Sequence, residues 1–89
     1  MAVQETSAEA YKEAVEPNLS ERQNLVMRLF RRYPYSDFTN QEIAEHLGWP
    51  INTVTPRVLE LRSKALLVAK TKRIDQKTGR RSIAWGLNV

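Results

Sequence analysis

The chain has 89 residues and no cysteine, and its 14 Lys/Arg against 10 Asp/Glu give a formal net charge of +4. This length suits one small domain, and without cysteine there is neither a disulfide nor a thiolate nucleophile or ligand. The single histidine, His46, cannot build a His-rich metal site. No apolar run approaches the roughly 18 residues of a membrane span, and the first ten residues lack a secretory-signal pattern, so we expect a soluble cytoplasmic protein.

The charge is unevenly distributed along the chain. Residues 1–21 hold one basic and five acidic residues (net −4), residues 22–56 hold four and three (+1), and residues 57–89 hold nine and two (+7). A basic carboxy-terminal third indicates a polyanionic partner, with nucleic acid favoured over a membrane surface.

The first predicted element is a short helix over Thr6–Glu16, with Glu9 placed to complete a capping box. A helix of this length is marginal by itself in water, so it either docks its apolar stripe on something or forms a partly ordered tail. We therefore separate an acidic amino-terminal segment, residues 1–18, from a domain over residues 19–89.

The second predicted helix opens at Ser20, has Gln23 at the third position of a capping box, and stops before Pro34. Its apolar residues recur at helical spacing and form one face: Leu25, Val26, Leu29, Phe30 and Tyr33. The connection Tyr35–Phe38 is a candidate for one small strand.

A third helix begins after Thr39, which forms a further capping box with Glu42. Gly48 is well placed to end this helix in a left-handed conformation, where a side chain would cost energy.

The fourth predicted helix begins near Ile51–Thr53 and is taken as residues 52–65. Its core stripe follows helical spacing: Val54, Val58, Leu61 and Ala65. Pro56 is tolerable only in the first turn, where its missing N–H has no intrahelical partner. This argues for a cap at Asn52 or Thr53, or for a local irregularity there.

The remaining residues predict a two-stranded hairpin. Asp75–Gly79 carries turn chemistry, and Gly79 can adopt positive φ. In the second strand, Ile83, Trp85 and Leu87 alternate with smaller residues and predict an apolar face. We expect Trp85 to pack in the core rather than to stack on a base.

Three helices followed by a basic hairpin is the element order of a winged helix. A helix–turn–helix needs a small residue at the helix contact, a turn residue tolerant of positive φ, and a branched apolar residue on the second helix. Ala44, Gly48 and Val54 supply these in order. The predicted fold is mainly α (α+β): a winged helix–turn–helix with a three-helix core, a carboxy-terminal β-hairpin wing and an extra short amino-terminal helix.

The segment IAEHLGWPINTVTPRVLELRSKALL resembles the helix–turn–helix of MarR-like winged-helix proteins. Together with ETSAEAY, LSERQ and TGRRSIAW, it is similar to small phage- or prophage-encoded winged-helix DNA-binding proteins over roughly residues 5–87. One departure is Ala65, where the family usually has glycine. The resemblance implies double-stranded DNA as partner and a place in the bacterial host cell, at the nucleoid.

In such folds the second helix of the helix–turn–helix enters the major groove. The candidate contacts on helix 52–65 are Asn52, Thr53, Thr55 and Arg57. Asn52 suits adenine, but asparagine is equally an ordinary capping residue. Arg57 either contacts DNA or pairs with an acid such as Glu60 or Glu42. Leu59 is an apolar residue on the exposed side and could meet a thymine methyl or a partner chain.

The wing, residues 69–83, is dense in basic residues: Lys70, Lys72, Arg73, Lys77, Arg80 and Arg81. Arg80 and Arg81 are the best minor-groove candidates, and Lys72 and Lys77 the best phosphate contacts. The alternative is a solvated hairpin without a partner.

No catalytic grouping assembles, so the sequence predicts no enzyme. It also suggests no cofactor, metal, membrane or small-molecule ligand. The favoured function is a DNA-binding regulator, and the alternative is a winged-helix interaction or accessory module of a replication or transcription complex. The segment Thr6–Glu16 is the candidate for homodimer formation.

Overall fold

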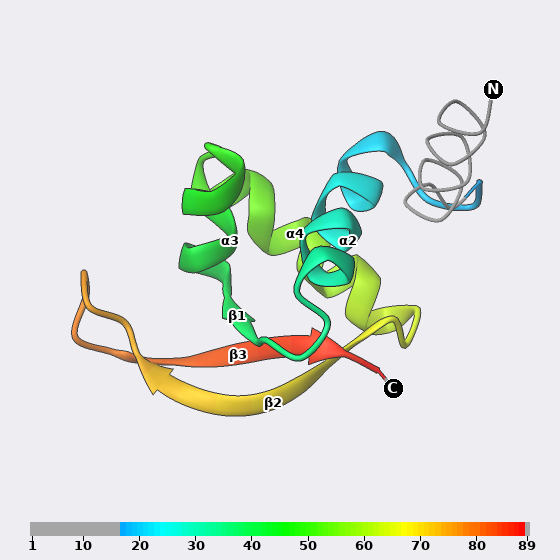
Figure 1. The fold of residues 1–89 in the computed structure, drawn as a ribbon. Coiled ribbons are helices and arrows are strands. Elements are labelled where there is room, and N and C mark those ends of the chain that lie inside the picture. The colour runs from blue at the N-terminus through cyan, green and yellow to red at the C-terminus, as the bar shows by residue number, and fades with distance from the viewer. Residues whose placement is uncertain (1–16, 89) are drawn as a thin grey trace, which may run out of the picture.

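Three helices precede a β-hairpin in the computed structural model, which describes residues 17–88 (Figure 1). The elements are α2 (Glu21–Arg32), β1 (Phe38–Thr39), α3 (Asn40–Leu47), α4 (Ile51–Ser63), β2 (Leu67–Ile74) and β3 (Arg81–Leu87). This is the predicted winged-helix order. The expected helix over Thr6–Glu16 lies outside the described residues. None of the described helices is long and apolar enough to cross a bilayer.

Two of the three predicted capping boxes are confirmed, and the third, at Thr6 and Glu9, lies outside the described residues. At the start of α2, the Gln23 backbone N–H donates to Ser20 Oγ at 3.2 Å, and Ser20 N–H donates to Gln23 Oε1 at 2.9 Å. At the start of α3, Glu42 and Thr39 make the same reciprocal pair at 3.2 and 2.9 Å. These four bonds satisfy backbone donors that the first turns leave without an intrahelical partner.

The two helices of the helix–turn–helix end on left-handed residues. Gly48 has φ of 69°, as predicted, and Ala65 has φ of 61°. Beyond α4, Ala65 N–H donates to Arg62 O at 2.9 Å and Leu66 N–H donates to Leu61 O at 3.0 Å. This pair of bonds is a Schellman motif. The alanine therefore adopts the geometry for which glycine is the favoured residue.

The fourth helix starts at the first residue of the range predicted for its start, Ile51–Thr53, but the cap predicted at Asn52 or Thr53 is wrong. α4 begins at Ile51, with Pro50 as the N-cap residue and no side-chain capping bond. Pro50 O accepts the N–H of Thr53 at 3.0 Å. Pro56 consequently lies in the second turn, inside the helix. The fixed φ of Pro50, −62°, together with its extended ψ of 147°, starts the helix without a side-chain cap.

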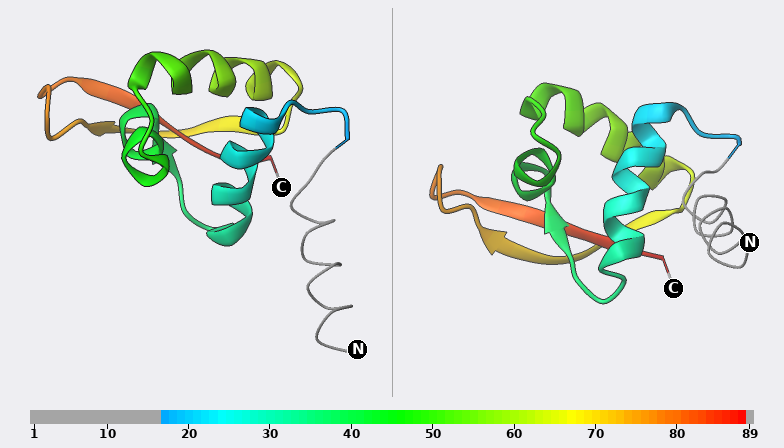
Figure 2. Two further views of the ribbon diagram at one scale, coloured as in Figure 1. Left: turned by 90° about the horizontal axis from the view of Figure 1, so that it is seen from above. Right: turned by 45° about the horizontal axis from the view of Figure 1, so that its top comes forward.

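The three strands form an antiparallel sheet in the order β1–β3–β2. Phe38 pairs with Trp85 across β1 and β3, so the small strand predicted within Tyr35–Phe38 is present but is limited to Phe38–Thr39 and overlaps the predicted range only at Phe38. The β2–β3 pairing runs from Leu67 with Leu87 to Ile74 with Arg81, with an irregularity between Ala69 and Thr71. The hairpin tip projects beyond α3 and the start of α4 (Figures 1 and 2).

The core lies between the three helices and the sheet. Its buried side chains come from every element: Val26, Met27, Leu29, Phe30, Phe38, Ile43, Ala44, Val54, Val58, Leu61, Leu67 and Trp85. The prediction of Trp85 as a core residue is confirmed.

Three residues that the sequence placed on apolar faces are solvent-exposed. Tyr33 is 41% exposed and Ile83 is 39% exposed, because Tyr33 follows the last turn of α2 and Ile83 lies in the part of β3 that extends into the wing. Ala65 is exposed because the helix has already ended at Ser63. The apolar pattern in the sequence therefore extends beyond the residues that the core buries.

Candidate nucleic-acid interface

One side of α4 is open to solvent and largely uncharged. Ile51 is 43% exposed, Leu59 is 49% exposed, and Asn52 is also exposed, while Thr53 and Thr55 are half-buried. The Thr55 hydroxyl donates to the Ile51 carbonyl at 3.1 Å, beside the position where Pro56 has no N–H to donate. Asn52 forms no cap, so the capping role that its residue type suggested is wrong.

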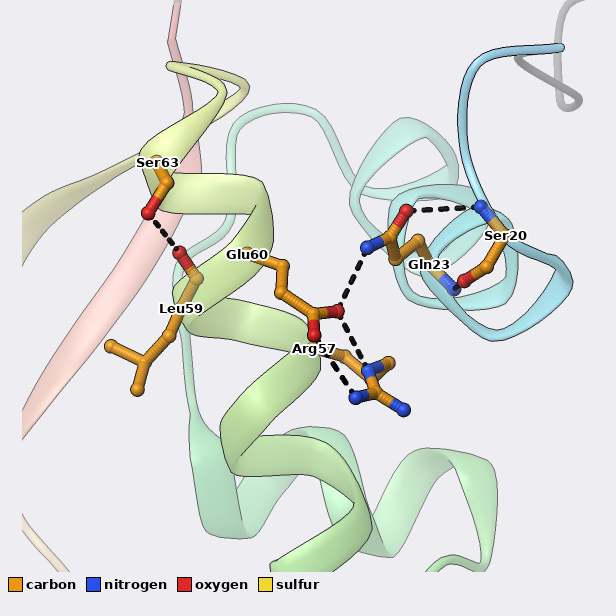
Figure 3. Close-up of polar contacts among 6 residues, drawn as sticks. All are labelled: Ser20, Gln23, Arg57, Leu59, Glu60 and Ser63. Atoms are coloured by element: carbon orange, nitrogen blue, oxygen red, sulfur yellow. Dashed lines mark hydrogen bonds and ion pairs between the residues drawn. The ribbon is translucent and has the colours of Figure 1, made fainter.

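Arg57 points toward α2. Its Nε and Nη2 donate to the two carboxylate oxygens of Glu60 at 2.8 and 3.0 Å. Gln23 Nε2 donates to Glu60 Oε1 at 2.8 Å, and the other end of the Gln23 side chain accepts the N–H of Ser20 (Figure 3). The sequence had offered pairing with Glu60 as one alternative for Arg57, and the structure contains that pair. Hydrogen bonds from Arg57 and then Gln23 hold the pKa of Glu60 below its ordinary value.

Two of the six wing bases are engaged with acids. Arg73 Nη1 lies 3.2 Å from Asp37 Oδ1, and its Nη2 donates to the Asp37 carbonyl at 2.9 Å and to Glu42 Oε1. Lys77 Nζ lies 2.9 Å from Glu45 Oε2, and this contact lowers the pKa of Glu45. We call these five residues the wing latch. It ties the hairpin to β1 and α3.

The other four wing bases make no ion pair with any residue of 17–88. All four are exposed: Lys70, Lys72, Arg80 and Arg81. Lys72 pairs with Ile83 and Ile74 pairs with Arg81. Because residues two apart on a strand point to the same face, Lys72 and Arg81 share one face of the wing.

A hollow of about 550 Å³ connects this part of the wing to the start of α4. Ile51 and Thr55 line it from α4, and Arg80, Arg81 and Ile83 line it from the wing. The structure therefore brings two predicted wing arginines and one predicted helix residue to the same surface.

Sequence reasoning missed two residues that line the hollow, Ile51 and Asn40. The amide nitrogen of Asn40 lies 3.5 Å from the Thr55 hydroxyl. Ile51 was missed because the candidate contacts chosen at the start of the helix were polar or basic residues. Asn40 gave no local signal, since it reaches Thr55 only through the packing of α3 against α4.

The turn at the tip of the wing is internally hydrogen-bonded. Gly79 N–H donates to the Asp75 carbonyl at 2.7 Å, and Asp75 N–H donates to the Arg80 carbonyl at 2.7 Å. Gly79 has φ of 70°, as the turn prediction required. The backbone of Arg80 is thereby positioned at the end of the hollow.

A second, larger hollow of about 770 Å³ lies on the other side of the wing latch. It is lined by acidic, aromatic and basic side chains, including Glu42, Glu45 and Arg73. His46 borders it and packs edge-on against Phe38, with ring centroids 5.2 Å apart. Within residues 17–88, no group of histidine, aspartate and glutamate side chains is arranged to hold a metal ion.

Two solved structures share this fold. A protein of Methanosarcina mazei Go1 described as a "possible transcriptional regulator" superposes with a TM-score of 0.67 at 20% identity, covering 91% of this chain. The PcaV transcriptional regulator of Streptomyces coelicolor, in complex with its natural ligand, superposes with a TM-score of 0.56 at 23% identity, covering 97% of this chain. The chain covers 64% and 57% of these proteins, less than two thirds of either.

These two likenesses show the fold, a winged helix of the kind found in transcriptional regulators. No protein-family model matches the chain. No curated protein sequence matches it either.

Proposed function

We propose that this protein binds double-stranded DNA as a transcriptional regulator, with α4 in the major groove and the wing on the backbone or in the minor groove. The observation that carries the proposal is the hollow where Arg80 and Arg81 lie beside the exposed side of α4. A recognition helix and a basic wing that open on one surface can engage a groove and its flanking phosphates together. The resemblance of the motifs adds a phage or prophage origin to the proposal.

The number of wing bases that are free to contact phosphate sets the expected salt dependence of DNA binding. Four wing bases are available for phosphate: Lys70, Lys72, Arg80 and Arg81. Each phosphate neutralised adds about −0.9 to the slope of log affinity against log salt. We therefore expect a slope between about −3 and −4 if all four bases contact phosphate.

The test is a duplex-binding titration by fluorescence anisotropy with two matched double variants. Reversing Arg80 and Arg81 to glutamate should abolish binding. Reversing Arg22 and Arg28 to glutamate makes the same charge change on exposed positions of α2, away from the wing tip (Figure 1), and should leave most of the affinity. The proposal fails if wild-type protein does not bind duplex at about 50 mM salt, or if both double variants lose affinity equally.

A further inference from the structure

The first three turns of α4 present no unpaired charge to the exposed side. The charged residues there, Arg57 and Glu60, bind each other, and Glu60 also accepts a hydrogen bond from Gln23 on the side that faces α2 (Figure 3). Leu59 projects on the side turned away from Gln23 (Figure 3). The next basic residue, Arg62, has its guanidinium 5.8 Å from the centre of the Trp85 ring.

This composition restricts which base edges α4 can read. The commonest specific contact in the major groove is an arginine or lysine on guanine, and the exposed side offers neither before Arg62. It offers two aliphatic side chains and one amide: Ile51, Leu59 and Asn52. Aliphatic groups suit the C5-methyl group of thymine, and asparagine suits the N6 and N7 edge of adenine.

The spacing of the aliphatic residues fits a short run of bases. Ile51, Thr55 and Leu59 follow one another at intervals of four and lie along one side of the helix. At 1.5 Å per residue, Ile51 and Leu59 are separated by about 12 Å along the axis. That distance corresponds to about three to four base-pair steps of 3.4 Å.

We call the exposed aliphatic side chains Ile51 and Leu59 the aliphatic stripe. The charge around this stripe favours DNA over an apolar protein surface as its partner. The hollow that begins at Ile51 is bordered by Arg80 and Arg81, for which the described residues provide no acidic partner. An apolar partner would leave these cations without an anion, whereas DNA places phosphates on either side of its base edges. The aliphatic stripe and the cations thus match different parts of one ligand.

We propose that α4 selects sites rich in A·T base pairs, with Ile51 and Leu59 against thymine methyl groups and Asn52 on adenine. This inference rests on the proposed function and adds the class of sequence that is read. Leu59 is the sharper probe, since it lies on the open side of α4 and its truncation leaves the core unchanged.

The experiment starts with selection of bound sequences from a random duplex pool. On the enriched site, each thymine is then replaced by deoxyuridine, which differs only by the missing methyl group. Wild-type protein should bind about fourfold more weakly when a contacted methyl is lost, the effect of one buried methyl or methylene group. Leu59→Ala should weaken binding to the thymine site by a similar factor and should no longer distinguish thymine from deoxyuridine at one position.

Tyr35→Ala is the control, because it truncates a fully exposed apolar residue away from α4 and should keep the full response to deoxyuridine. Equal binding of all deoxyuridine sites, or an enriched motif dominated by G·C pairs, would overturn the inference while leaving duplex binding intact. Failure to bind any duplex would overturn the proposed function and this inference with it.

Discussion

Replacing Arg73 with glutamine separates a residue that positions the wing from one that is proposed to contact DNA. Arg73 joins β2 to Asp37 before β1 and to Glu42 on α3. Arg80, on the same hairpin, makes no ion pair within residues 17–88. Arg73→Gln and Arg80→Gln each remove one positive charge, so a difference between them reports on placement rather than on net charge.

The stability cost of Arg73→Gln follows from the contacts that it removes. The guanidinium binds two carboxylates and one carbonyl oxygen, but its side chain is 40% exposed and that of Glu42 is 43% exposed. An exposed ion pair contributes about 0–1 kcal/mol, so the group should contribute about 1–2 kcal/mol. For a domain of this size, that lowers Tm by roughly 4–15 °C. Arg80→Gln should change Tm by much less, because no bond is lost.

The salt dependence of duplex binding should show the opposite pattern: it should change in Arg80→Gln and stay the same in Arg73→Gln. Arg80→Gln should reduce the slope of log affinity against log salt by about 0.9, the contribution of one phosphate. Arg73→Gln should weaken affinity at every salt concentration and leave the slope unchanged, because the wing is less well placed but no phosphate contact is removed. The assays are thermal unfolding by circular dichroism and anisotropy titrations at four salt concentrations.

One outcome would refute this reasoning directly. If Arg73→Gln lowers the salt slope by about one unit and leaves Tm unchanged, Arg73 contacts phosphate, and its bonds to Asp37 and Glu42 contribute nothing to the fold. Arg73 was among the DNA contacts predicted from sequence, so this result would restore that assignment.

Two further changes test the scaffold around the interface by thermal unfolding. Ala65→Gly should raise Tm by about 2–8 °C, because a left-handed alanine costs about 1–2 kcal/mol and the added backbone entropy of glycine offsets only about 0.5–1 kcal/mol of that. A lower Tm would show that the Schellman motif is not strained by alanine. Glu60→Gln should lower Tm at pH 7, where the carboxylate binds Arg57 and Gln23. The pKa of Glu60 in the folded protein lies below its ordinary value of 4.5, so its contribution is present above that pH and is lost as the pH falls through the lowered value; a Tm difference that stays constant to pH 2.5 would contradict the pairing.

The features that sequence predicted correctly are those decided within a few residues. Ser20 with Gln23, and Thr39 with Glu42, needed only a spacing of three to define a capping box. Gly48 needed only its own freedom to adopt positive φ. The N-cap position of α4 was missed for the complementary reason: Pro50 sets the first turn through its backbone, and no polar side chain marks the position.

The roles of the basic residues could not be predicted in the same way. Arg73 meets Asp37 across 36 positions and Glu42 across 31, and Glu60 meets Gln23 across 37. Composition shows how many bases a segment holds, but whether an acid lies opposite each one depends on the packing of the wing against α3 and of α4 against α2. Lys70, Lys72, Arg80 and Arg81 are distinguished from Arg73 and Lys77 only once those contacts exist.

The pairing of charges divides the proposed interface into two parts with different physical chemistry. Among residues 17–88, the wing keeps four bases without an ion pair, and the exposed side of α4 keeps none in its first three turns, since Arg57 is bound to Glu60. Phosphate contacts release counterions and weaken steeply with salt, whereas methyl contacts and neutral hydrogen bonds release none. Affinity should therefore be set mainly by the wing and fall with salt, while discrimination between sites should be set mainly by α4 and change little. Under the proposed function, placing the charges on one element and the base-reading groups on another would let a small domain bind DNA strongly without binding every sequence equally.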